Sequence, residues 1–170
     1  MRIILIFLVL SQCSIKNEQS EWETIFNGKN LDGWTVKIKG FPSGDNFGNT
    51  FKVVDEAIQV SYENYDNFDF NFGHIYFTAK KYKYYRLKLE YKFFGNQAIG
   101  GEGWATKNSG IMFHSQHPET MLIDQSFPVS LEAQFLGGLG DGKRPTGNLC
   151  TPGTDAVSYT HLTLPTNREV

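Results

Sequence analysis

The sequence contains no long stretch in which apolar side chains recur at the spacing of an amphipathic helix. Short runs instead alternate between apolar and polar residues, and glycine, proline or asparagine separates them. The clearest run is 82–94, where tyrosine, leucine and phenylalanine alternate with arginine, lysine and glutamate. Such alternation predicts a strand with one buried face and one charged face. The chain is therefore expected to fold from strands rather than helices.

Several other runs read as strands, and turn residues bound each of them. These candidates are 22–25, 35–39, 51–54, 57–62, 73–78, 108–116 and 129–135. Aromatic residues make up 15% of the chain and glycine occurs 17 times, a composition that suits short strands joined by tight turns. The 170 residues leave room for one ordinary domain. We therefore expect an all-β sandwich or barrel.

The charge balance argues against a nucleic-acid partner. Lysine and arginine number 16 against 18 aspartates and glutamates, which gives a formal net charge of −2. A nucleic-acid-binding domain is usually basic. The sequence also lacks the P-loop, GxSxG, HExxH and paired CxxC motifs, and the glycine-rich stretches 100–103 and 137–140 do not open a helix as nucleotide-binding loops do.

The first residues have the layout of an export signal. Arg2 precedes an unbroken apolar run over 3–10, which is too short to cross a bilayer as a helix. The next residues resemble the cleavage site of bacterial lipoproteins, with Cys13 as the lipid-bearing residue, although Gln12 departs from the small residue of that pattern. We expect a signal peptide at 1–12, a tether at 13–20, and an exported domain held by lipid in the periplasm or at the cell surface.

The last residues resemble something other than a natural protein. The stretch SYTHLTLPT within 157–170 is similar to a translated sequencing adapter, which predicts a non-native tail. An ordinary C-terminal strand with a turn at Pro165 is the alternative. On the first interpretation the domain spans 21–156 and is truncated at its C-terminus. If Cys13 carries lipid, Cys150 has no partner in the chain, so no disulfide framework supports the domain.

Two strand candidates carry a polar face that is suited to chemistry. Asn108, Met112, His114 and Gln116 share one face of 108–116, while Ser130, Glu132 and Gln134 share one face of 129–135. The opposite faces are mainly apolar. Glycine-rich loops nearby carry Glu102, Trp104 and Arg144, and charged loops beside a polar sheet face often form binding sites. The alternative is that these polar side chains simply face water.

Four segments resemble stretches of one family, namely its opening signature, its two central motifs and a stretch found in one of its branches. They are TIFNGKNLDGW at 24–34, NSGI at 108–111 with His114, SLEAQ at 130–134, and the stretch 144–154. In this order they are similar to the 3-keto-disaccharide hydrolase family of bacteria. The resemblance implies a concanavalin A-like jelly-roll β-sandwich. The closing strands of that fold should follow Thr154, where this chain has its adapter-like tail.

The resemblance also implies an exported enzyme that acts on glycosides oxidised to a ketone at C3. A ketone acidifies the proton on C2, so a base can remove it, the C1 substituent leaves, and water adds back. On this hypothesis Glu132 is the base or a metal ligand and His114 is a ligand or an acid. The residues expected to bind the sugar are Asn108, Gln134, Arg144, Glu102 and Trp104. A divalent metal ion such as Ca²⁺ stays open, because the sequence offers no complete ligand set.

A carbohydrate-binding module on the same sandwich is the alternative function. It would use Trp34, Trp104 and surface tyrosines as stacking platforms, although a tryptophan placed like Trp34 more often fills a core. An enzyme needs Glu132 and His114 to converge, whereas a binding module needs an exposed aromatic platform. A third possibility is a truncated, inactive chain that exposes apolar faces and strand edges.

Overall fold

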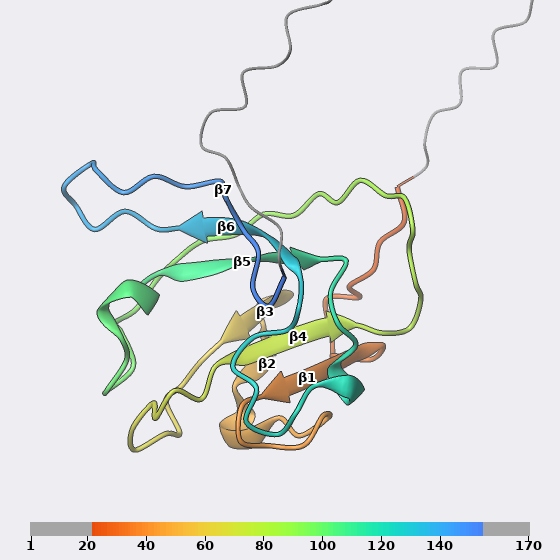
Figure 1. Cartoon of the computed structure of the whole chain (residues 1–170), viewed down its shortest axis with the longest axis horizontal. Helices are drawn as coiled ribbons and strands as arrows, with labels where there is room; N and C mark the ends of the chain where they lie inside the picture. Colours follow the sequence, from red (N-terminus) through yellow and green to blue (C-terminus); the bar gives the residue numbers. More distant parts are fainter. Residues whose placement is uncertain (1–21, 155–170) are drawn as a thin grey trace, which may run out of the picture.

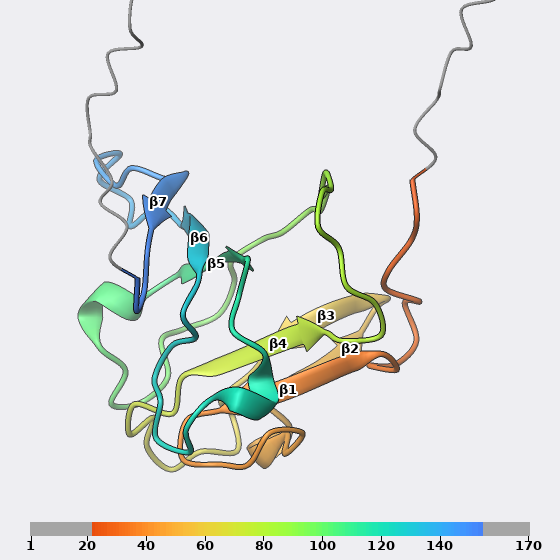
Figure 2. The ribbon, with the colours of Figure 1, turned by 45° about the vertical axis from the view of Figure 1, so that its right-hand side comes forward.

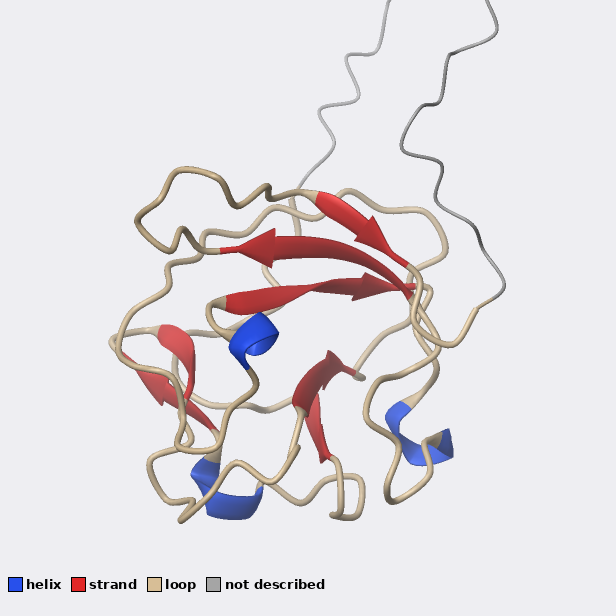
Figure 3. Ribbon diagram, turned by 60° about the vertical axis from the view of Figure 1, so that its left-hand side comes forward, coloured by secondary structure: helices blue, strands red, loops and turns tan. Residues whose placement is uncertain are grey.

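The computed structural model describes residues 22–154, and strands are its only extended elements. The strands are β1 (Trp34–Ile38), β2 (Phe51–Val54), β3 (Ala57–Val60), β4 (Gly73–Phe77), β5 (Asn108–Phe113), β6 (Leu131–Leu136) and β7 (Asn148–Cys150). Three short 3-10 turns join them: η1 (Phe47–Asn49), η2 (Gly103–Ala105) and η3 (Pro118–Thr120). The all-β prediction is therefore confirmed (Figure 3). Within 22–154, no helix has the length and apolar character needed to span a membrane.

The terminal expectations fall outside the described residues. The signal peptide at 1–12, the lipidated Cys13 with its tether to residue 20, and the non-native tail at 157–170 all lie there. They stay predictions.

The strands form three antiparallel sheets. β1 pairs with β4, β2 pairs with β3, and β5, β6 and β7 follow one another in a three-stranded sheet. Figures 1 and 2 show the β5–β6–β7 sheet as a layer separate from the β1–β4 pair. This layering gives β4 one face directed toward β2–β3 and another directed toward the three-stranded sheet.

The predicted hairpin between 51 and 62 is confirmed by β2 and β3. Its two turn residues, Asp55 and Glu56, adopt left-handed φ angles of 49° and 59°. Two such residues in a row make the turn whose twist matches paired strands. The register follows directly, with Val54 opposite Ala57.

The core lies between β1–β4 and β2–β3. Val36, Ile38 and Phe51 are buried there, and Ile58 and Ile75 pack against them. These residues alternate along their strands with the side chains of the other face, which include Thr35, Lys37, His74 and Tyr76. The polar face of β1–β4 is thus a direct consequence of the apolar residues that build the core.

Lys37 is an exception on that face because its whole side chain is buried. Its Nζ donates to the backbone carbonyls of Ile38 (2.9 Å), Phe41 (2.9 Å) and Ile123 (3.1 Å). A buried charge is tolerated when its hydrogen-bonding capacity is satisfied, as it is here. Lys37 therefore ties β1 to the chain that follows it and to the loop before β6.

The strand predicted at 82–94 is wrong, and so is the one at 22–25. Neither segment joins a ladder in the described part of the chain. The ring of Tyr91 stacks on Phe135 of β6 at 4.3 Å between centroids, so segment 80–97 contacts β5–β6 over the sheet face and not along its edge. Alternation predicts which side chains turn toward the core, but a strand also needs a neighbouring backbone edge.

Candidate functional site

The polar face of the β5–β6–β7 sheet gathers the residues of the candidate site. Met112 of β5 lies opposite Glu132 of β6, and Cys150 of β7 lies opposite Glu132 on the other side. Two residues further along β6, Gln134 lies between Gly110 of β5 and Asn148 of β7 in the same way. The side chains of Ile111, Ala133 and Phe135 alternate to the opposite, apolar face, as the sequence predicted.

Glu132 is the single acidic residue among the paired positions of this face. Burial raises the pKa of its carboxyl above the usual value of 4.5. Its carboxylate accepts no side-chain or backbone hydrogen bond from residues 22–154, although its neighbourhood is partly closed to water. A raised pKa and an uncommitted carboxylate are properties of a general base or acid.

Gly110 makes the room that the Glu132 carboxylate occupies. A Cβ at position 110 would overlap Oε1 of Glu132 and would lie 2.8 Å from its Cγ and from the carbonyl oxygen of Ala133. The backbone of Gly110 is ordinary strand, so conformation does not demand glycine here. The absent side chain therefore positions Glu132.

Three amides form a hydrogen-bonded row across the sheet beside Glu132. Asn148 Nδ2 donates to Gln134 Oε1 at 3.0 Å, and Gln134 Nε2 donates to Asn108 Oδ1 at 3.3 Å. Asn108 Nδ2 donates in turn to the backbone carbonyl of Trp104 at 3.3 Å. Because that carbonyl can only accept, it fixes the orientation of every amide in the row. The sequence predicted Asn108 and Gln134 on one face but missed Asn148, which lies in a strand too short to show alternation.

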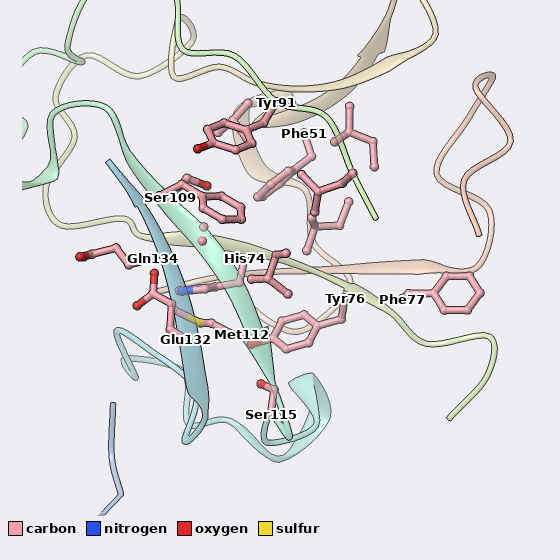
Figure 4. A pocket seen from close by; sticks show the side chains of 18 of the residues that line it. Phe51, His74, Tyr76, Phe77, Tyr91, Ser109, Met112, Ser115, Glu132 and Gln134 are labelled. Atoms are coloured by element: carbon pink, nitrogen blue, oxygen red, sulfur yellow. The ribbon is translucent and has the colours of Figure 1, made fainter. Parts of the chain in front are cut away.

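A histidine that the sequence analysis did not single out faces Glu132. Figure 4 shows His74 and Tyr76 reaching from β4 toward Met112 and Glu132. Burial, with a smaller contribution from the Lys37 charge, lowers the pKa of His74 from 6.5 to about 4, so the imidazole is neutral at pH 7. Its Nδ1 is buried and has no hydrogen-bond partner. Alternation along 73–78 could have identified His74, since Ile75 and Phe77 take the other face.

Tyr76 anchors β4 to the end of β5. Its hydroxyl donates to Met121 Sδ at 3.0 Å and is hydrogen-bonded to the Ser115 side chain. Burial raises the pKa of this phenol, which keeps it protonated at neutral pH. Tyr76 therefore holds the polar face of β4 against β5, the strand that pairs with Glu132.

His114 does not join Glu132, contrary to the expectation that the two share a face. β5 ends at Phe113, and His114 has a left-handed φ of 51°, which breaks the alternation. Its exposed ring lies 5.9 Å from that of Phe113, and it lines a pocket with Ile111 and Ala133 from the apolar face. The backbone turn thus takes His114 off the face that carries Glu132, and His114 borders both this pocket and the larger cavity described below.

Arg144 is engaged by the protein's own backbone. Its guanidinium donates to the carbonyls of Trp104 (3.1 Å), Gly137 (3.1 Å) and Thr106. These bonds tie the loop after β6 to η2 and to the end of the amide row. Arg144 therefore stabilises the predicted binding loops through their backbone carbonyls.

Trp104 is the most exposed aromatic ring beside the amide row. It is 52% exposed and stacks on Phe72, with centroids 5.5 Å apart. Glu102 lies at the start of η2, and its side chain does not cap that turn. Trp34, in contrast, is half-buried and packs edge-on against Phe26 and Phe77.

A cavity of about 2350 Å³ is lined by residues of β4, β5, β6 and η2, whereas Glu102, Arg144 and Asn148 do not line it. It is several times larger than a typical small-molecule site of roughly 300–1,000 Å³, so its volume alone does not locate a ligand. His74, Glu132 and Gln134 line it together. Among residues 22–154, no three histidine, cysteine or acidic side chains cluster as metal ligands would. The divalent metal stays a hypothesis.

Comparison with known proteins gives one match. The model of a family described as "3-keto-alpha-glucoside-1,2-lyase-like domain" matches residues 21–168. No curated protein and no solved structure matches the chain. The matched range covers the whole of the sheet, cavity and loops described above.

Proposed function

Because the chain belongs to the family of 3-keto-alpha-glucoside-1,2-lyase-like domains, whose fold is concanavalin A-like, we propose that it cleaves the glycosidic bond of 3-keto-glycosides. The observation that carries this proposal is the Glu132 carboxylate, half-buried and uncommitted, with a pKa that burial raises. A carboxylate of raised pKa is a stronger base than one in water. Removal of a carbon-bound proton next to a ketone requires such a base.

The reaction proceeds by elimination and hydration. Glu132 takes the C2 proton, the electron pair of the C–H bond forms the enediolate with the C3 oxygen, and the bond from C1 to the aglycone oxygen breaks. The aglycone oxygen takes a proton from water, and the resulting hydroxide adds to C1. Glu132 returns its proton to C2, so the net reaction is hydrolysis.

The amide row supplies groups that can bind sugar hydroxyls. Asn108, Gln134 and Asn148 already orient one another, so they lose little freedom when a ligand binds. The site is suited to a small carbohydrate substrate.

Replacement of Glu132 by glutamine tests the assignment. Glu132→Gln keeps the shape of the side chain but cannot accept the C2 proton, so kcat on a 3-keto-glycoside should fall at least ~10²-fold. Glu119→Gln is the matched control, because Glu119 is exposed and does not line the cavity. In the unaltered chain, kcat/KM should rise with pH through a value above that of an ordinary carboxyl, since only deprotonated Glu132 acts. Normal activity of Glu132→Gln would remove Glu132 from the mechanism.

Carbohydrate binding without catalysis is a second candidate, favoured by Trp104. Its exposed indole, supported from behind by Phe72, is a suitable platform for a sugar ring. Calorimetric binding of unoxidised glycosides, lost in Trp104→Ala, together with no turnover of any 3-keto-glycoside would favour this candidate over the enzyme.

We also propose that the domain is exported and lipid-anchored through Cys13. The support is the sequence alone: Arg2, the apolar run 3–10, and the cleavage-site pattern before Cys13. The unaltered chain should partition with membranes and incorporate labelled fatty acid, and Cys13→Ser should do neither. Equal membrane partitioning of both chains would contradict the anchor.

A further inference from the structure

We propose that His74 binds the C3 oxygen of the substrate and stabilises the enediolate, acting from the sheet that faces Glu132. This inference rests on the proposed function. It names the residue that would stabilise the negative charge of the reaction intermediate. Base removal of the C2 proton places negative charge on the C3 oxygen, so the site needs a hydrogen-bond donor there. The geometry of β4 provides one.

The surroundings of its two ring nitrogens determine what His74 can donate. Nδ1 is buried without a partner, whereas Nε2 is not among the buried, unpartnered atoms of the described residues, and the His74 side chain lines the cavity that Glu132 also lines. A proton on Nδ1 would leave a buried N–H unpaired, which folded proteins avoid. The proton therefore resides on Nε2, where water or a substrate oxygen can accept it. His74 thus presents a neutral N–H donor to the cavity.

A buried positive charge lies next to this donor. Lys37 is directly opposite His74 in the β1–β4 register, and its charge acts on the imidazole. Its three hydrogen bonds hold the ammonium in place, and Asp124 is the acidic group that acts on it. A fixed cation beside His74 favours negative charge on an oxygen that His74 holds. Burial and the Lys37 charge both lower the pKa of His74, so the imidazole stays neutral and does not repel the Lys37 ammonium.

The two sides of the cavity then have distinct tasks. Glu132, from β6, removes the proton from C2, while His74, from β4, donates a hydrogen bond to the C3 oxygen without transferring its proton. No further reactant is needed, because His74 ends the cycle in the state in which it began. His74 acts only on a ketone, since a C3 hydroxyl develops no negative charge.

Kinetics of His74 variants tests the inference. In His74→Leu, kcat on a 3-keto-glycoside should fall about 10²-fold, as for loss of one oxyanion donor, while binding of the parent glycoside with a C3 hydroxyl stays unchanged. His74→Gln, which can place an amide donor in the cavity, should recover part of the loss. Leu139→Gln is the control, because Leu139 is exposed and does not line the cavity.

Two results would overturn the inference. One is full kcat in His74→Leu, and the other is an equal loss of binding for the keto and the hydroxyl glycoside, which would show a merely structural role. If the unaltered chain does not turn over 3-keto-glycosides, the proposed function fails together with this inference. If it does and His74→Leu matches it, only the inference fails.

A spectroscopic measurement decides the matter even if His74→Leu does not fold. In the Glu132→Gln chain saturated with a 3-keto-glycoside, nitrogen NMR should show the His74 proton on Nε2, with a shift that the C3-hydroxyl analogue does not produce. A proton on Nδ1, or identical spectra with both ligands, would overturn the assignment.

Discussion

At the scale of the residue, the candidate site depends on a side chain that is missing. The Glu132 carboxylate lies over Gly110, in space that any larger residue would fill. The burial that raises the pKa of Glu132 follows from this placement. Position 110 therefore controls where the Glu132 carboxylate lies, although it has no functional group of its own.

Gly110→Ala should lower activity as well as stability. The added methyl group displaces the Glu132 carboxylate and crowds the Ala133 carbonyl, so kcat should fall about 10-fold or more and the unfolding free energy by about 1–3 kcal/mol. Steady-state kinetics and urea unfolding measure the two effects. Gly138→Ala is the control, since a Cβ there meets no atom within 4 Å. Unchanged kinetics in Gly110→Ala would contradict the packing described here.

The sequence identified part of this site because alternation is local. Side chains alternate with a period of two along each strand, so the pattern placed Asn108 on the polar face of its strand and Gln134 on the same face as Glu132. His74 escaped notice because its relevance depends on which sheets face each other, and Asn148 because β7 is too short to show alternation. His114 was assigned to the wrong face because its left-handed φ cannot be deduced from alternation.

At the scale of the element, segment 80–97 has the pattern of a strand without a strand's hydrogen bonds. Leu87, Leu89 and Tyr91 are between 43% and 52% exposed, which is high for residues at the apolar positions of such a pattern. The hairpin of β2 and β3, by comparison, was predicted correctly because its partner follows two residues later. Sequence patterns determine pairing well over short distances and poorly over long ones.

Amide hydrogen exchange should distinguish these elements. Amides of 80–97 join no ladder in the described residues, so they should exchange far faster than those of β6, which is paired on both sides. Mass spectrometry of peptides spanning 82–94 and 131–136 measures the difference. Equal protection of the two peptides would mean that 82–94 is paired in solution, as its alternation first indicated.

At the scale of the whole molecule, His74 couples the fold to pH. Its pKa is 6.5 in an ordinary environment and about 4 in the folded chain, so the unfolded chain binds more protons between these values. The contribution of His74 to the free energy of unfolding is therefore fully present above pH 6.5, and it is lost as the pH drops toward 4. Glu132 acts in the opposite direction, because its pKa is raised on folding.

Urea unfolding at pH 7 and pH 4 should show this coupling. The unaltered chain should lose about 3 kcal/mol more than His74→Leu does between the two values, by the relation between pKa shift and free energy. In Glu132→Gln the loss should become larger than in the unaltered chain, because the opposing contribution is gone. Parallel losses in the unaltered chain and His74→Leu would contradict a buried neutral imidazole.

The amide row has a direction, and this makes its two ends unequal. At one end Asn108 Nδ2 donates to the backbone carbonyl of Trp104. At the other end the side-chain oxygen of Asn148, Oδ1, accepts no hydrogen bond from residues 22–154. The acceptor of the row that has no partner in the described residues therefore lies at the Asn148 end, in β7. A ligand that binds across the row would therefore meet different hydrogen-bonding groups in its two orientations.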